Sequence, residues 1–139
     1  VNGPADYRGM ARMAAENSVA IAGFRALGGG ALMSAAANTL TRHPIAGGGF
    51  TRNAAQYKRE VELAARLVTR LGIQGTNAMA ALAYRFNITD PRITTTVAGF
   101  SELSHLHGAV DGLRKGALSA DEMQSIMGTW HELFALDPT

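Results

Sequence analysis

Two segments of the chain follow the same order of features, and together they restrict the possible folds more than any other part of the sequence. Val19–Gly30 and Thr94–Lys115 each begin with a short apolar or β-branched run that ends at a glycine and leads into a loop and then a helical pattern. This order is typical of (β/α) barrels, whose ligands bind to the loops at the carboxyl ends of the strands. A complete barrel takes about 250 residues, whereas this chain has 139. We therefore expect an α/β fold that forms part of a barrel.

The composition limits the classes of protein to which the chain can belong. A hydrophobic content of 47% suits an ordinary core, and the 13 basic and 11 acidic residues are interspersed, so we expect neither a nucleic-acid partner nor a membrane. The absence of cysteine excludes disulfides, Cys-ligated zinc and thiol chemistry, and it suits a cytoplasmic protein. The start at Val1, followed by a turn-like Asn2-Gly3-Pro4, favours a fragment or a processed chain.

Periodic apolar residues predict about five helices. We expect them over Ala5–Asn17, from Asn53 to Leu71, from Thr76 or Asn77 to a break at Asp90-Pro91, over Leu103–Leu113 and from a capping box at Ser119–Glu122 onward. The first should cover the sheet with a stripe of Tyr7, Met10, Met13 and Ala14, and the second should face inward through Val61, Ala64, Ala65, Val68 and Leu71. Leu103, Leu106, Val110 and Leu113 mark the fourth helix. Gly72 and Gly116 are expected to end the second and fourth helices.

Two parallel strands are expected at Val19–Phe24 and Ile93–Ala98. The first is apolar on both faces, which predicts burial between the barrel interior and an outer helical layer. A long loop follows it from Arg25 to Asn53, with a short helix near Ala31–Ala37. The free N–H groups of Gly28–Gly30 could approach a phosphate, with Arg25 supplying charge, although a plain turn explains the same glycines.

The sequence from Ala22 to Gly30 resembles the seventh-strand motif of the aldo-keto reductases, in which an aromatic residue precedes serine, proline, leucine and often a glycine run. The resemblance places Phe24 where the family stacks an aromatic ring on the nicotinamide, and Leu27 and Gly28 keep the pattern. Arg25 and Ala26 stand where the family has serine and proline. Apart from the resemblance, Phe24 can also be read as a core aromatic residue at a strand end.

Thr95–Ser101, with the helix that follows, is similar to the eighth strand and phosphate loop of the same family. The resemblance implies cofactor contacts at Gly99, Phe100, Ser101 and His105, the last where an arginine usually holds the 2′-phosphate of NADP. Gly108 and Ala109 stand where a glutamate and an asparagine usually hold the adenine. Read from the residues alone, His105 and His107 belong to a solvated helix face, and their spacing of two prevents them from sharing a metal.

The resemblance spans roughly Ala5 to Leu118 and implies that residues 1–139 form the C-terminal portion of a (βα)8 TIM barrel. It implies binding of NADP, with NAD as an alternative, in a reductase for carbonyl or sugar-type substrates. The family's catalytic residues belong to the other barrel half, and Tyr7, Tyr57 and Tyr84 lie on expected helices. We therefore assign no catalytic or metal-binding residue and expect the chain alone to be inactive. The partner would be the missing barrel half or another copy of the chain, and a non-enzymatic helical interaction module is the alternative function.

Overall fold

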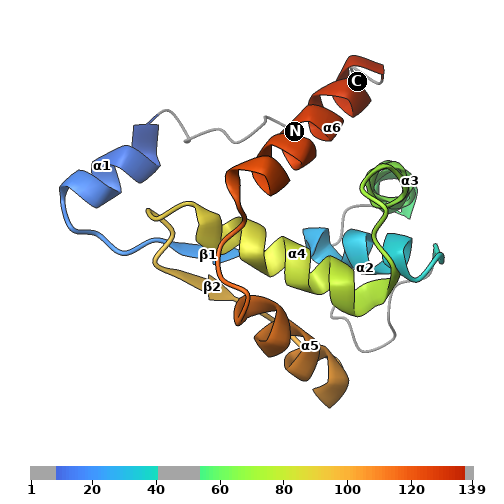
Figure 1. The fold of residues 1–139 in the computed structure, drawn as a ribbon, viewed down its shortest axis with the longest axis horizontal. Coiled ribbons are helices and arrows are strands. Elements are labelled where there is room, and N and C mark those ends of the chain that lie inside the picture. Colours follow the sequence, from blue (N-terminus) through green and yellow to red (C-terminus); the bar gives the residue numbers. More distant parts are fainter. Residues whose placement is uncertain (1–8, 41–53, 137–139) are drawn as a thin grey trace.

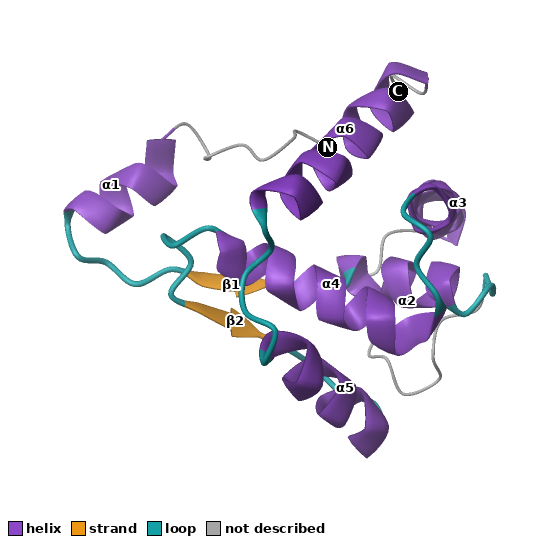
Figure 2. Cartoon of the chain, viewed as in Figure 1, coloured by secondary structure: helices purple, strands orange, loops and turns teal. Residues whose placement is uncertain are grey.

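The computed structural model describes residues 9–40 and 54–136. Its elements, in chain order, are α1 (Met10–Glu16), β1 (Ala22–Phe24), the 3-10 turn η2 (Gly28–Gly30), α2 (Ala31–Ala36), α3 (Ala54–Arg70), α4 (Gly75–Thr89), β2 (Thr95–Val97), α5 (Leu103–Leu113) and α6 (Ala120–Leu136). The expected α/β class with two parallel strands is confirmed, and six α-helices are described instead of about five (Figures 1 and 2). Asn53, the predicted start of the second helix, and residues 41–53 of the long loop lie outside the described residues.

The two strands form a parallel pair, with Ala22 opposite Thr95, Gly23 opposite Thr96 and Phe24 opposite Val97. They lie side by side in Figure 1, and both are shorter than the sequence predicts. Helix α4 lies over one face of the pair, because a Cβ on Gly23 would be 3.6 Å from the Asn87 Nδ2 atom. Because the two strands run parallel, their carboxyl ends meet at the same edge, as a barrel requires.

The other face of the strand pair is exposed. Phe24 and Val97 keep 68% and 62% of their surface accessible, and Ala22 and Thr95 on the same face are also exposed. The expectation that this strand is buried on both faces is wrong, because no described element covers this side. The bare face corresponds to the side that points into the interior of a barrel whose helices form the outer layer.

The described core lies between helices. One cluster joins α2 to α3 through Ala31, Ala35, Tyr57, Val61 and Ala64. A second cluster joins α4 to α5 through Ala80, Tyr84 and Ala109, with Leu27 and Ala98 packed against it. The second cluster attaches the loops after both strands to the helical layer.

Helix α1 does not cover the sheet as expected. None of its residues is buried, Met10 and Met13 are exposed, and the helix lies apart from the strands in Figure 1. Tyr7, the remaining large residue of the predicted stripe, lies outside the described residues. The amphipathic pattern correctly predicted a helix, but the described part of the chain offers no surface on which its apolar side packs.

The ends of the later helices follow local signals. Gly72 and Gly116 adopt φ values of 64° and 76° just after α3 and α5, in the left-handed region that favours glycine. The capping box before α6 is confirmed, since the Glu122 N–H donates to Ser119 Oγ at 3.2 Å and the Ser119 N–H donates to Glu122 Oε2 at 2.8 Å.

Candidate functional site

The candidate site lies where the two strands end. Phe24 and Val97 are register partners, so the segments Arg25–Gly30 and Ala98–Ser101 leave the sheet at the same edge. Leu27 and Ala98 then pack against the same helical cluster. The predicted parallel arrangement of the two strands is confirmed, and it brings these two segments to one edge.

Arg25 adopts a strained backbone conformation at this edge. Its φ is 61°, a left-handed value that costs a non-glycine residue about 1 kcal/mol or more. Its side chain turns over the glycine run, because a Cβ placed on Gly29 would lie 2.6 Å from Arg25 Nη2. Arg25 is the one cationic residue in the stretches 19–30 and 94–105, so it carries the positive charge of the site.

The glycine run is ordered into a turn. The Gly28 N–H donates to the Arg25 carbonyl at 2.8 Å, and the Gly30 N–H donates to the Leu27 carbonyl at 3.0 Å. The expectation that these N–H groups are free is wrong for Gly28 and Gly30, because the turn that connects β1 to α2 uses them. All three glycines have positive φ, which a side chain would disfavour.

The second segment is more open. No atom lies within 4 Å of the position that a Cβ on Gly99 would occupy, and Gly99 is exposed. The ring of Phe100 lies 6.3 Å from the ring of Tyr84, with an angle of 51° between the two planes. Ser101 and His105 are half-buried, and His105 belongs to the first turn of α5, where its N–H donates to the Glu102 carbonyl at 3.1 Å.

The described tyrosines do not supply a proton donor at the site. The Tyr57 hydroxyl is buried and lies 2.8 Å from Ser34 Oγ, between α2 and α3. Tyr84 is buried on α4, and desolvation raises the pKa of its hydroxyl above the ordinary value of 10.0, which works against proton release. Within the described ranges, no group of three or more His, Asp or Glu side chains could hold a metal ion.

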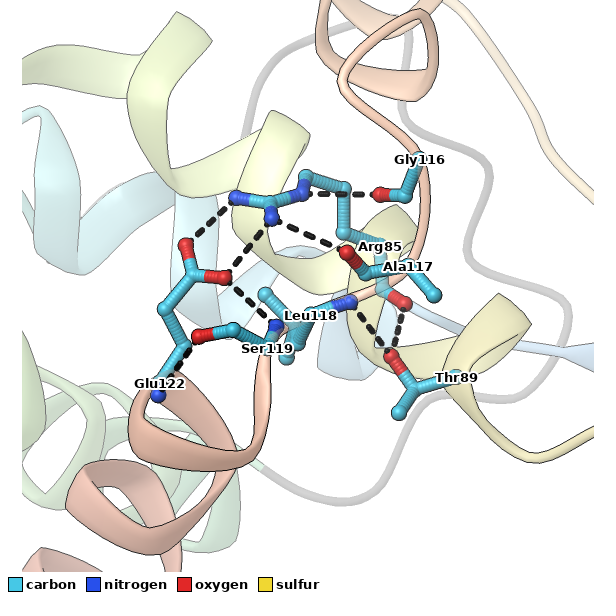
Figure 3. Close-up of polar contacts among 7 residues, drawn as sticks. All are labelled: Arg85, Thr89, Gly116, Ala117, Leu118, Ser119 and Glu122. Atoms are coloured by element: carbon cyan, nitrogen blue, oxygen red, sulfur yellow. Dashed lines mark hydrogen bonds and ion pairs between the residues drawn. The ribbon is translucent and has the colours of Figure 1, made fainter.

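Sequence reasoning missed a polar network that joins α4 to the segment before α6 (Figure 3). Arg85 Nη1 and Nη2 donate to the two Glu122 carboxylate oxygens at 2.7 and 2.8 Å. Arg85 Nε donates to the Gly116 carbonyl at 2.9 Å, and Nη2 also donates to the Ala117 carbonyl at 3.1 Å. The capping box was readable from its local spacing, but a pair 37 residues apart has no local signal.

Thr89 completes this network. Its hydroxyl donates to the Arg85 carbonyl at 2.7 Å and accepts the Leu118 N–H at 2.9 Å. The guanidinium lowers the pKa of Glu122 to about 2, with help from the Ser119 N–H. The network fixes the connection between α5 and α6 from the far end of α4, so it supports the helix that carries His105 without contacting the site.

None of the described helices has the length and apolarity needed to cross a membrane.

Comparison with known proteins gives one match. Searches among curated proteins and among solved structures found no similar protein. The sequence profile described as the aldo/keto reductase family matches residues 3–131, nearly the whole chain. Together with the parallel strand pair and its helical outer layer, this match shows that the chain belongs to the aldo/keto reductase family.

Proposed function

We propose that this chain is the cofactor-binding, C-terminal part of an NADP(H)-dependent aldo/keto reductase that acts on carbonyl or sugar-type substrates. The observation that carries the proposal is the parallel register of β1 and β2, which brings the Arg25–Gly30 and Ala98–Ser101 segments together at one edge. Family membership supplies the nicotinamide cofactor as the expected ligand. On this proposal, residues 1–139 form one partial barrel domain with a cytoplasmic location.

The exposed groups at this edge fit a nicotinamide dinucleotide in part. Phe24 offers an accessible ring on the inward-facing side of the sheet, where it would stack on the nicotinamide. Arg25 offers a guanidinium fork for the pyrophosphate, in place of the hydroxyl and N–H donors that glycine loops usually provide. The open space beside Gly99 allows the cofactor backbone to approach the chain closely.

The choice between NADP and NAD depends on the start of α5. On this proposal, Phe100, Ser101 and His105 would contact the adenosine 2′-phosphate, as the family resemblance implies. No lysine or arginine lies between Thr94 and His105, so on this proposal an imidazole N–H of His105 would donate to that phosphate.

When bound, the cofactor supplies the hydride for carbonyl reduction. The residues of this chain would hold the cofactor in place, and none of them is assigned to the transfer of the substrate's proton, because Tyr57 and Tyr84 are buried between helices. We therefore propose that the chain is inactive until the remaining barrel strands are present. Those strands would come from a further segment of a longer protein or from another copy of the chain.

The alternative function is a helical interaction module without enzymatic activity. The exposed apolar side of α5 favours this alternative, because large apolar side chains on a surface helix commonly mark a contact with another protein. The two functions differ in a simple observable, which is whether the chain binds a nicotinamide cofactor.

The test is a calorimetric titration of the purified chain with NADPH and NADH, comparing Arg25→Ala with wild type. Arg59→Ala, which removes an exposed arginine from α3, is the matched control. We expect Arg25→Ala to weaken NADPH binding at least tenfold, or about 1.4 kcal/mol, and Arg59→Ala to leave it unchanged. Absence of NADPH binding to the wild-type chain would favour the interaction module, and equal binding by wild type and Arg25→Ala would remove Arg25 from the site.

A further inference from the structure

Helix α5 presents its small residues to α4 and its large apolar residues to solvent. A Cβ on Gly112 would come within 2.7 Å of the Ala81 Cα atom, and a Cβ on Gly108 within 2.9 Å of Asn77 Oδ1. The contact at Gly112 brings the backbone of α5 close to the backbone of α4, and Gly108 lies against the Asn77 side chain. The large apolar residues of α5 are left exposed, and we call them the α5 stripe: Leu103 (67% exposed), Leu106 (38%), Val110 (40%) and Leu113 (37%).

The spacing within the α5 stripe suits contact with another helix. Its members follow one another at intervals of three, four and three residues, which keeps them on one side of the helix, as in the seam of paired helices. The intervals are the same from either end. A second α5 lying antiparallel would therefore place Leu103 opposite Leu113 and Leu106 opposite Val110 of the second copy.

The charges at the two ends of the stripe select this arrangement. Glu102 precedes the stripe, Arg114 follows it, and both are exposed. Antiparallel pairing brings Glu102 of each copy near Arg114 of the other, whereas parallel pairing brings like charges together. Opposed helix dipoles also favour the antiparallel arrangement. We propose that α5 is a self-association surface, on which the α5 stripe of one chain packs antiparallel against the α5 stripe of a second copy.

The size of the contact determines its strength. An 11-residue helix is about 16 Å long, and four side chains per copy bury less area than the roughly 1,200–2,000 Å² of a stable interface. The dimer should therefore be weak and reversible, and its population should depend on protein concentration.

The first experiment measures the oligomeric state by sedimentation over protein concentrations from about 10 μM to about 1 mM, a range that brackets weak association. We expect the wild-type chain to shift from monomer to dimer across this range. Leu106→Glu should weaken the association at least tenfold, because it places a charge in the contact. Val19→Glu changes an exposed apolar residue outside α5 and should leave it unchanged. Circular dichroism would confirm that both variants keep their helix content.

The second experiment tests the orientation, and it is clean because the chain has no cysteine of its own. An equal mixture of Leu103→Cys and Leu113→Cys chains, oxidised under mild conditions, should give a disulfide-linked dimer that contains one chain of each variant. Each variant alone should give much less, because antiparallel helices hold identical positions near their ends far apart.

Several outcomes would overturn the proposal. A chain that stays monomeric up to about 1 mM would show that a second copy does not cover the stripe, as expected if an adjoining strand and helix of a longer protein cover it instead. A dimer that survives Leu106→Glu would place the contact elsewhere, for example on the bare face of the strand pair. Cross-linking mainly between identical positions would contradict the antiparallel arrangement. None of these outcomes depends on NADPH binding, so this proposal and the proposed function fail separately.

Discussion

At the level of single residues, the missing side chain of Gly112 decides how closely α5 approaches α4. The contact that a Cβ would meet is the main chain of Ala81 and its Cβ, which cannot rotate away as the end of a flexible side chain could. Gly108 faces the side chain of Asn77, which has more freedom to move. The two glycines, four residues apart on one helix, are therefore unequal in their tolerance of substitution.

We predict that Gly112→Ala destabilises the chain by about 1–3 kcal/mol, the usual cost of overpacking a tight contact. Gly128→Ala is the control, because Gly128 lies on α6 with nothing within 4 Å of its Cβ position. That change should be neutral or slightly stabilising, since alanine favours a helix over glycine by about 1 kcal/mol. Urea unfolding followed by circular dichroism measures both. Equal stability of Gly112→Ala and wild type would mean that the two helices are not in close contact.

At the level of elements, Arg85 connects α4 to the α5–α6 connection and to the start of α6, both of which are distant from it in sequence. Its side chain is only 13% exposed, and it contacts two carbonyl groups in the α5–α6 connection and the carboxylate at the start of α6. The position of α6 relative to α4 therefore depends on Arg85 together with Thr89, whose hydroxyl accepts the Leu118 N–H. A second ion pair, Arg70 to Glu132 at 2.7 Å, joins α6 to α3 near its other end, but both of its side chains are more than half exposed.

Replacing Arg85 should have a larger effect than replacing an exposed arginine. Arg85→Ala removes the donor of the half-buried Gly116 carbonyl and the two part-buried bonds to the Glu122 carboxylate, and should cost about 1–3 kcal/mol of the free energy of unfolding. Arg114→Ala removes a side chain that is 76% exposed and 3.1 Å from Asp111, and should cost no more than about 0.5 kcal/mol. Thermal unfolding of the two variants gives the comparison, and similar losses would argue against the network.

The Glu122 carboxylate should make the stability of the chain depend on pH in a defined range. Its pKa is about 2 in the folded chain, against an ordinary value of 4.5, because Arg85 and the Ser119 N–H stabilise the charged form. A lowered folded pKa means that the stabilisation is complete above about pH 4.5 and is lost as the pH falls toward 2.

The measurement is the urea midpoint of wild type and Glu122→Gln between pH 6 and pH 2, at steps of about half a unit. The difference between the two proteins should be constant above about pH 5 and shrink toward about pH 2. Asp90, whose pKa Arg92 also lowers, titrates in both proteins and cancels in the difference. A difference that is independent of pH would show that Glu122 is not engaged in the folded chain.

At the level of the whole molecule, the described structure has a helical layer and an uncovered strand pair. A parallel sheet of two strands with one bare face is not a usual stable end state, because parallel sheets normally have both faces covered. The helices alone account for the two described core clusters. The described residues therefore form part of the outer helical layer of a barrel. They do not enclose the interior that a complete set of strands would surround.

We predict that the purified chain does not reduce a reactive aldehyde with NADPH. Loss of a positioned general acid typically costs about 100- to 10,000-fold in rate, and both described tyrosines are buried between helices. The rate of NADPH oxidation should equal that of a heat-treated sample, with mass spectrometry used to exclude longer species. Activity above that background would mean that the catalytic residues must be sought among Tyr7, Tyr57, Tyr84, Lys58 and His105.

The features that sequence predicted well depend on neighbouring residues. The glycine after α3, the capping box at Ser119 and the break at Asp90-Pro91 each act within one helical turn, so their spacing is visible in the sequence. The parallel pairing of the two strands was also predicted, because the order of strands, loops and helices resembles that of the aldo-keto reductases. Burial of α1 and of both strand faces was predicted wrongly, since an apolar pattern shows which side could be covered and not whether anything covers it.

Some contacts at the candidate site could not have been predicted from sequence. Nothing in the residue types shows that Arg25 adopts a left-handed backbone or that its side chain turns back over Gly29. The pairing of Arg85 with Glu122 depends on how α4 and α6 come together in three dimensions. Such contacts follow from the packing of whole elements, which no local pattern encodes.

The register of the strand pair has a consequence for the order of folding. The two strands contact each other across 73 residues of sequence, as in the bond from the Ile21 N–H to Thr94 Oγ1, and only three residue pairs join them. Closing so long a loop costs conformational entropy, and the few hydrogen bonds between the two short strands offset little of that cost. By contrast, α4 and α5 contact each other across a much shorter separation in sequence. The helices should therefore form before the strands pair, and amide protons of β1 and β2 should exchange with solvent faster than those of α3 and α4. The part of the chain that carries the candidate cofactor contacts would thus be the last to form and the first to open.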